Sequence, residues 1–436
     1  MLPDDTIAAI ITPYGRGGVG GIRISGKEAR EVAGRVIMDF PGGIEPRKVY
    51  TGKIDKTDTI LYYFLKSPNS YTGEDTIEIF CHGSPPILER IMGLIVKAGA
   101  RQARPGEFTQ RAYLGGKMDL AQAEAVLDLI NAGTDKTASL AYEQMGGKTS
   151  NEIGKIREEA LGLLAKIEAS IDFPDDLKTN DKEALAGIEK LRKKVADCIA
   201  AAESSRQYRE GVRVAIIGKP NVGKSTLLNA LAKHERAIVS RHPGTTRDTI
   251  EEQINLRGIP ASIIDTAGIR EARGEIEGQG AERARKEIER ADLVVVVMDG
   301  SKMAGKEDKE ILRLCRDKAQ VIALNKKDLG QKIGVQGAWI SALKGEGIEE
   351  LEEAIHRGIL GQKRECQILF SARQAEQMER ANEALQRAGE SIKIGREEAM
   401  VTIDLRLAIE ALGGVIGVGV EEEIIDQIFA RFCVGK

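Results

Sequence analysis

One short segment constrains the fold more than any other part of the chain: Gly-Lys-Pro-Asn-Val-Gly-Lys-Ser at positions 218–225. A β-branched run at 212–217 precedes it, and a helical pattern at 226–232 follows it. Glycines in such a loop let main-chain N–H groups and the N-terminus of the next helix face a phosphate. The segment therefore predicts a P-loop, with Lys224 at the β- and γ-phosphates and Ser225 on Mg²⁺.

Apolar strand runs continue beyond this loop. They recur at 261–264, 293–298 and 321–324, and helical patterns separate them. This alternation is typical of a doubly wound α/β domain with a parallel sheet. We expect a Ras-like P-loop GTPase domain at residues 209–362.

A second motif predicts which base is bound. Asn325-Lys-Lys-Asp328 follows the strand run at 321–324. The carboxylate of Asp328 can accept hydrogen bonds from the N1–H and the exocyclic amine of guanine, a pairing that adenine cannot offer. Asn325 and Lys326 are expected to brace this loop. The predicted GTP contacts from these motifs are Asn221, Val222, Gly223, Lys224, Ser225, Thr226, Asn325, Lys326, Asp328, Ser341, Ala342 and Leu343.

Two further segments have the residues of GTPase switches. Asp265-Thr-Ala-Gly268 would hold Mg²⁺ through water and sense the γ-phosphate, and Gly244-Thr-Thr-Arg-Asp248 would supply Thr246 to the metal. Position 269 is Ile, where many small GTPases place the glutamine that positions water. The chain is therefore expected to orient water differently and to use another cation in place of an arginine finger. The switch contacts to GTP would come from Thr246, Asp265, Thr266, Ala267 and Gly268.

Residues 1–115 predict an α+β domain. Strand patterns lie at 7–12, 21–25 and 76–80, and helical patterns lie at about 25–38 and 85–98. Ser25 and Glu28 have the spacing of a capping box for the first of these helices. A formal G-x-G-x-x-G at 15–20 is rejected as a dinucleotide loop, because a strand and not a helix follows it.

Helical spacing dominates residues 116–208 and 363–436. Helices are expected at 120–131, 182–204, 371–392 and 402–412. Asp119 and Gln122 would cap the first, and Ile171-Asp-Phe-Pro174 would end another helix before its proline. The glycine-rich stretch 413–419 predicts a tight connection. The α/β domain is thus expected to be inserted between two halves of an all-α domain.

Composition limits the function classes only in part. The 64 basic and 67 acidic residues nearly balance, so a nucleic-acid contact would need a local patch. The acidic start and the lack of an uncharged apolar run of membrane-helix length favour a cytoplasmic protein without membrane contact. The four histidines suggest no metal site. Free thiols are expected at the five scattered cysteines: Cys81, Cys198, Cys315, Cys366 and Cys433.

Motifs outside the nucleotide site complete a family pattern. They are Thr12-Pro-Tyr-Gly-Arg-Gly-Gly-Val-Gly20, Tyr71-Thr-Gly-Glu-Asp75, Arg104-Pro-Gly-Glu-Phe-Thr109, Asp119-Leu-Ala-Gln-Ala-Glu124, Ile171-Asp-Phe-Pro174 and Phe432-Cys-Val-Gly-Lys436. With the GTPase motifs, they make the chain resemble the bacterial MnmE (TrmE) family of tRNA-modification GTPases over essentially its full length. Val434 stands where the family usually has Ile.

The resemblance implies an activity and partners. Residues 1–115 would bind 5-formyl- or 5,10-methylene-tetrahydrofolate and form a homodimer. With an FAD-dependent partner protein, in a heterotetramer, the chain would install an aminomethyl or carboxymethylaminomethyl group on carbon 5 of the tRNA wobble uridine. The folate would supply the one-carbon unit, and GTP hydrolysis would drive the conformational cycle.

The same resemblance implies roles at the GTP site. A potassium ion near the phosphates would take the place of an arginine finger. Glu277 would orient the attacking water, although its neighbour Glu275 could be confused with it. The catalytic set would then be Glu277, Lys224 and Thr246. The implied potassium ligands, which add Ser240 and Thr245 to the GTP contacts, are Asn221, Ser240, His242 and Thr245. His242 departs from the family's aliphatic residue, but it would bind through its carbonyl.

Folate contacts are implied at Arg23, Glu78, Lys117 and Lys436. A carboxylate can pair with the amino-pyrimidine edge of a pterin, and cations suit the pterin carbonyl and the glutamate tail. Cys433 is a candidate nucleophile toward C6 of uridine, although a lone cysteine is more often inert.

Two other function classes stay open from the residues alone. A ribosome-assembly or regulatory switch GTPase would share the GTP motifs and perform no RNA chemistry. It would be expected to carry a basic RNA-binding module, which the flanking sequences lack, and it has no use for a folate domain. An interaction scaffold that uses GTP structurally predicts no turnover, against the complete P-loop, Asp265 and Thr246.

Overall fold

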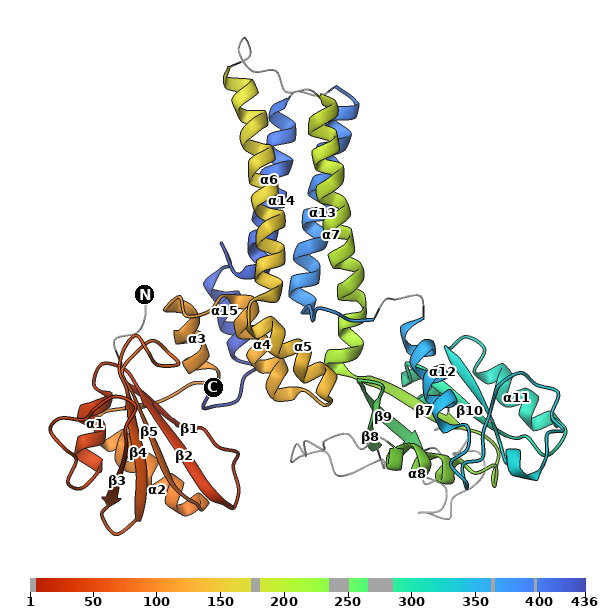
Figure 1. The fold of residues 1–436 in the computed structure, drawn as a ribbon, viewed down its shortest axis with the longest axis horizontal. Helices are drawn as coiled ribbons and strands as arrows, with labels where there is room; N and C mark the ends of the chain where they lie inside the picture. The colour runs from red at the N-terminus through yellow and green to blue at the C-terminus, as the bar shows by residue number, and fades with distance from the viewer. Residues whose placement is uncertain (1–4, 174–180, 235–250, 266–284, 362–364, 396–397) are drawn as a thin grey trace. The chain divides into compact units, whose positions relative to one another are not determined.

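The computed structural model describes residues 5–173, 181–234, 251–265, 285–361, 365–395 and 398–436 (Figure 1). The chain divides into two compact units. The first unit is Met1–Leu127 with Gly413–Lys436, and the second unit is Asp128–Leu412. The division of the chain at 115, 208 and 362 into four segments stays a prediction. Among the described helices, none combines the length and apolar character needed to span a membrane.

The first unit is built on a six-stranded sheet with the order β3-β4-β5-β2-β1-β6. Its strands are β1 (Ile7–Ile10), β2 (Gly17–Ser25), β3 (Val49–Ile54), β4 (Asp58–Leu65), β5 (Thr76–Gly83) and β6 (Arg101–Gln102). Helices α1 (Ala29–Val36) and α2 (Pro85–Lys97) contribute to one apolar core with one face of this sheet. Neighbouring strands are antiparallel except β1 and β6. This α+β arrangement confirms the predicted class of the domain.

The end of the chain belongs to this first unit. Helices α3 (Glu107–Leu114) and α15 (Glu422–Phe429) contact each other, and the amide N–H of Phe108 donates to the carbonyl of Lys436 at 3.2 Å. Gly435 approaches β1 so closely that a Cβ atom would lie 2.3 Å from the Ile10 carbonyl oxygen. The terminal Phe-Cys-Val-Gly-Lys segment is thus held against the N-terminal sheet.

One local prediction was wrong, and another holds only in part. Ser25 does not cap α1: it is the last residue of β2, and its hydroxyl donates to Glu74 at 2.7 Å and shares a hydrogen bond with Thr72. A tertiary partner therefore replaces the local capping box. The connection predicted at 413–419 is shorter than expected, because α14 (Glu398–Ile416) continues through Gly413. The left-handed turn comes only at Gly417.

Long helices form one part of the second unit, and Figure 1 shows α6, α7, α13 and α14 side by side. The helices before the α/β domain are α4 (Leu120–Asn131, shared with the first unit), α5 (Asp135–Met145), α6 (Lys148–Asp172) and α7 (Asp181–Glu210), and α13 (Ala372–Lys393) and α14 follow it. The Asp119–Gln122 capping box of α4 is confirmed by two hydrogen bonds of 2.9 and 3.0 Å. Helix α7 contacts both α6 and α13, so the two sequence halves of the helical domain pack together.

The α/β part of the second unit has the sheet order β12-β11-β10-β7-β9-β8. Its strands are β7 (Val212–Ile217), β8 (Glu251–Leu256), β9 (Ile259–Asp265), β10 (Leu293–Asp299), β11 (Gln320–Asn325) and β12 (Ala338–Trp339). Its helices are α8 (Lys224–His234), α11 (Lys306–Leu314), the 3-10 turn η1 (Lys327–Leu329) and α12 (Ile348–Leu360). All strand pairs are parallel except β8 with β9. The four predicted strand runs all lie in strands, and the polar edge strand β8 was missed.

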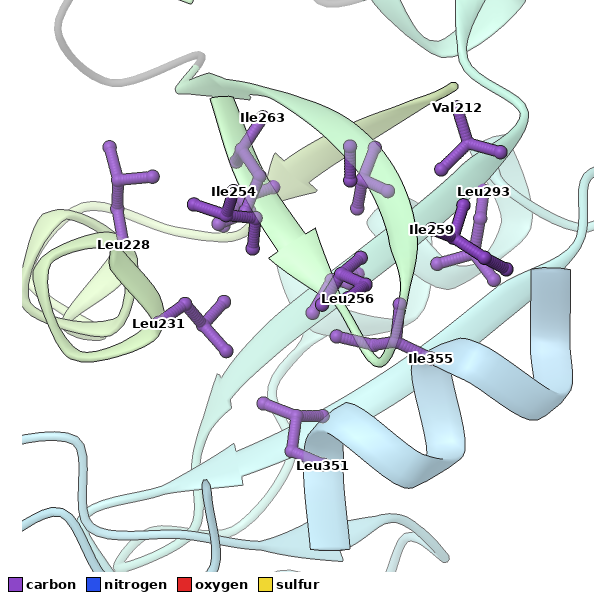
Figure 2. Packing of buried hydrophobic residues seen from close by; sticks show 14 of the residues in the cluster. Val212, Leu228, Leu231, Ile254, Leu256, Ile259, Ile263, Leu293, Leu351 and Ile355 are labelled. Carbon is purple, nitrogen blue, oxygen red and sulfur yellow. The ribbon is translucent and has the colours of Figure 1, made fainter. Parts of the chain in front are cut away.

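The β8–β9 hairpin joins the α/β sheet to the base of the helices. Figure 2 shows side chains of this hairpin meeting those of α8 and α12, and Leu140 and Tyr208 from the helical part belong to the same cluster. The hydroxyl of Thr134 donates to the carbonyl of Gly258 at the hairpin turn at 2.7 Å. The hydroxyl of Thr137 donates to the carbonyl of Tyr208 at 3.1 Å. Gly258 at this turn is therefore buried against α5 and the end of α7.

Gly258→Ala is expected to destabilise the α/β sheet. Gly258 has a φ of 95°, and a Cβ atom there would lie 2.8 Å from Cβ of Lys136. Overpacking of this kind costs about 1–3 kcal/mol, in addition to the strain of a left-handed alanine. Urea unfolding followed by the fluorescence of Trp339, the single tryptophan, measures it.

Gly345→Ala is the matched control, because Gly345 has a φ of 75° and no atom within 4 Å of a Cβ. Equal losses in the two variants would show that the hairpin contact contributes nothing.

Candidate functional site

The predicted P-loop connects β7 to α8 through backbone that only glycine allows at two positions. A Cβ atom on Gly218 would lie 2.3 Å from the carbonyl oxygen of Val297. Gly223 has a φ of 96°, and a Cβ atom there would lie 2.3 Å from Nδ2 of Asn325. Asn221 has a φ of 61°. The loop is therefore folded tightly by contacts with β10 and β11.

The P-loop lysine is held inside this loop. Lys224 is 7% exposed, and its Nζ donates to the carbonyl oxygens of Gly218 at 3.0 Å and Lys219 at 2.8 Å. The other lysine of the loop, Lys219, points to a different partner: its Nζ pairs with the buried carboxylate of Asp308 at 2.6 Å, and this contact anchors the loop to α11. A positive charge is thus fixed at the start of α8, where a helix N-terminus also favours anions.

Asn325 joins three loops. Its Nδ2 donates to the carbonyl of Val222 in the P-loop at 2.8 Å, and its Oδ1 accepts from the amide N–H of Ala342 at 2.9 Å. Nζ of Lys326 pairs with Oδ2 of Asp299 at the end of β10 at 2.8 Å. These contacts bring the phosphate loop and both predicted base loops together, as the sequence motifs require.

Asp328 lies in η1 with an exposed carboxylate. The hydroxyl of Ser341 donates to its Oδ1 at 2.8 Å, and this bond, ahead of the charges of Lys344 and Lys326, holds the pKa of Asp328 below its ordinary value. The carboxylate is therefore ionised at neutral pH and can accept hydrogen bonds. Leu343, on the neighbouring loop, is 82% exposed.

Most switch residues lie outside the described part of the chain. Asp265 is the last residue of β9 and pairs with Ile216 of β7, so its backbone stands at the carboxyl end of a strand beside the P-loop. The predicted residues outside the described ranges are Ser240, His242, Thr245, Thr246, Thr266, Ala267, Gly268, Ile269, Glu275 and Glu277.

A second polar site lies in the first unit, on the sheet face opposite the core. Nε of Arg23 donates to Oε1 of Glu78 at 2.7 Å. The guanidinium carbon of Arg23 lies 5.1 Å from the ring centre of Tyr71 and 5.3 Å from that of Phe108. Two of the four residues implied for folate are therefore in direct contact, and aromatic rings flank the cation.

The other two implied residues attach to the segments that carry those rings. Nζ of Lys117 donates to the carbonyl of Pro68 at 2.8 Å, and its side chain passes beside Gly73 in the loop that also holds Tyr71. The main chain of Lys436 contacts Phe108. The sequence alone did not indicate Tyr63, whose hydroxyl hydrogen-bonds to Glu78, because that contact depends on strand register.

All five cysteines are free, as expected, and only Cys433 is exposed. Burial raises the pKa of the Cys81 thiol to about 11 and that of Cys198 to about 12, and it also raises those of Cys315 and Cys366. These four thiols are therefore poor nucleophiles at neutral pH. Among the described residues, no cluster of His, Cys, Asp and Glu could hold a metal ion.

Comparisons with known proteins match both parts of the chain. A family model described as the GTP-binding protein TrmE N-terminus matches residues 6–117, and one described as the MnmE helical domain matches residues 120–433. The tRNA modification GTPase MnmE of Natranaerobius thermophilus is 39% identical over 100% of both chains. That of Thermotoga maritima is 39% identical over 99% of this chain and 100% of its own.

Among solved structures, the FeoB G-domain from Methanococcus jannaschii is 30% identical. The match covers 34% of this chain and 97% of that one, with a TM-score of 0.25.

Proposed function

Because the chain belongs to the MnmE family of tRNA-modification GTPases, it is a GTP hydrolase that acts in tRNA modification, and we propose that it modifies the wobble uridine. With an FAD-dependent partner protein, it installs an aminomethyl or carboxymethylaminomethyl group on carbon 5. A 5-formyl- or 5,10-methylene-tetrahydrofolate supplies the one-carbon unit. The chain acts as a homodimer within a heterotetramer, and its GTPase depends on potassium.

The Arg23–Glu78 pair is the observation that carries the folate part of this proposal. The Glu78 carboxylate is only 6% exposed, and it lies on the sheet face opposite the main core. A buried carboxylate with a paired cation is costly to keep unless it serves recognition or structure. Its oxygens match the two N–H donors on the amino-pyrimidine edge of a pterin. A switch GTPase without RNA chemistry has no use for such a site.

The GTPase chemistry follows from charge placement. Lys224 neutralises the β- and γ-phosphates, and Ser225 and Thr246 hold the Mg²⁺ that the GTPase family requires. Asp265 would bind that ion through water, and the Asp328 carboxylate accepts hydrogen bonds from guanine. Potassium, when bound, supplies the second cation, with Asn221, Ser240, His242 and Thr245 as its ligands. Cys433, exposed near the folate residues in the first unit, remains the candidate nucleophile.

Glu277→Ala is expected to retain GTP binding and to lose at least about ten-fold in turnover, because an acid that orients water contributes on the order of 10² or more to rate. Single-turnover hydrolysis in potassium buffer, alongside titration with a fluorescent GTP analogue, separates the two effects. Glu275→Ala is the control, and it should hydrolyse GTP normally. If the two variants exchange these properties, the role passes to Glu275, and if neither loses turnover, neither residue orients the water.

Mass spectrometry of nucleosides tests the whole proposal. Transfer RNA from cells that lack this protein is compared with tRNA from the same cells carrying the gene again. The expected result is loss of 5-(aminomethyl)- and 5-(carboxymethylaminomethyl)-uridine types and their return on complementation. Unchanged nucleosides, in a cell with no second copy of the gene, would rule out wobble-uridine modification.

A further inference from the structure

Three side chains form a row across three neighbouring strands of the first unit. Strands β4, β5 and β2 are adjacent, with Tyr63 directly opposite Glu78 and Glu78 directly opposite Arg23. Residues on either side of each, such as Ile77 and Ile79, are fully buried in the core. Since alternate residues of a strand point to opposite faces, the row lies on the other face of the sheet.

Both oxygens of the Glu78 carboxylate have a donor from this row. Nε of Arg23 donates to Oε1, and the hydroxyl of Tyr63 donates to Oε2. Burial, together with the neighbouring charge of Glu78, raises the pKa of Tyr63, so the hydroxyl keeps its proton. Tyr63 is therefore the donor and Glu78 the acceptor at neutral pH.

Neither donor can turn away freely. Tyr63 stacks on Phe80 with ring centres 5.8 Å apart, and the guanidinium of Arg23 lies against Tyr71 and Phe108. A carboxylate has about four lone-pair sites, and these two bonds use one on each oxygen. The carboxylate plane is thus fixed, and one acceptor site remains on each oxygen.

We propose that Tyr63 is a positioning residue for ligand recognition: its hydroxyl orients Glu78 to accept two parallel N–H groups of a cyclic guanidine edge. The 2-amino-4-oxopyrimidine ring of a reduced pterin has this edge. This inference rests on the proposed folate function, and it extends the set of folate residues by one that acts through Glu78.

Tyr63→Phe removes only the hydroxyl and keeps the ring on Phe80. Binding to the full chain is measured by calorimetry with two probes, 5-formyl-tetrahydrofolate and its analogue with a methyl group in place of the 2-amino group. A lost hydrogen bond to a charged group weakens affinity roughly ten-fold. We expect that loss for the parent folate and about two-fold or less for the analogue, so the discrimination between them shrinks.

Tyr50→Phe is the control, because Tyr50 lies on the neighbouring strand β3 and its hydroxyl accepts from the amide of Glu45. It should leave both affinities unchanged. If Tyr63→Phe weakens the binding of both probes equally, the role of Tyr63 is structural. If it weakens neither, Tyr63 has no role in folate binding. Either result overturns the proposal for Tyr63 while the folate site stands. If the wild-type chain binds neither probe, the folate function fails and this inference fails with it.

Discussion

Asp328→Asn is expected to weaken GTP binding by about 10²- to 10³-fold and to create binding of xanthosine triphosphate. The ionised carboxylate accepts from both N–H groups of guanine, whereas an asparagine amide presents an N–H group to the guanine amine, donor against donor. Xanthine carries a carbonyl at that position, which the amide can satisfy. Titration with fluorescent analogues of both nucleotides measures the exchange.

The loop geometry makes this test specific. Asp328 is exposed and accepts a hydrogen bond from Ser341, whereas the contacts of Asn325 and Lys326 run to other residues, so the substitution leaves those contacts in place. Asp317→Asn, an exposed change after α11, is the control and should alter neither affinity. A variant that still prefers GTP over xanthosine triphosphate would remove Asp328 from base recognition.

The sequence predicted the nucleotide site well because its signals are local. The strand 212–217 has the bounds of β7, and the glycines of the P-loop stand where a Cβ atom has no room. The Asp119–Gln122 capping box formed between partners only three residues apart. Such spacing predicts a cap when the side chain of the capping residue is not taken by a tertiary partner.

Contacts that depend on the rest of the fold were the ones missed. Ser25 was assigned to a helix cap, but Glu74 and Thr72, brought in by another loop, take its hydroxyl. Strand β8 begins with two glutamates and pairs antiparallel at a sheet edge, so its pattern resembles a polar loop. Tyr63 could be assigned to Glu78 only from the β4–β5 register. Register is set by the hydrophobic pattern of both strands and by the turn that joins them, so Tyr63 and Glu78 alone do not reveal it.

A buried ionic cluster in the first unit carries the second large prediction. Arg111 is 1% exposed, and its guanidinium donates to Asp5 at 2.7 Å, Glu74 at 3.0 Å and Glu107 at 3.2 Å. Arg101 also pairs with Glu107 at 2.6 Å. The cluster ties α3 to the segment before β1 and to the loop that holds Tyr71, so it supports the ring beside Arg23.

Arg111→Met is expected to destabilise the first unit by about 3 kcal/mol at pH 7, since Glu74 loses its cation while Asp5 keeps Arg101 and Glu107 keeps Arg101 and Arg104. Methionine keeps most of the apolar length of the side chain, which limits the cavity. Native-state hydrogen exchange of β1 and β2 peptides across a urea series measures the loss in this unit alone. Arg90→Met is the control: Arg90 is an exposed residue of α2, so its loss should be near zero.

Acidification should shrink the cost of Arg111→Met. The pKa of Glu107 is lowered, because hydrogen bonds from Arg101, Arg104 and Arg111 outweigh the opposing effect of burial. The pKa of Asp5 is lowered in the same way by Arg101 and Arg111. A carboxyl with a lowered pKa stabilises the fold above its unfolded value, about 4, and loses that contribution as pH falls through the folded value. The variant has less of this contribution to lose. The difference between the two proteins should therefore shrink as pH falls below about 4, and a difference that stays constant or grows there would show that the cluster contributes through packing and not through charge.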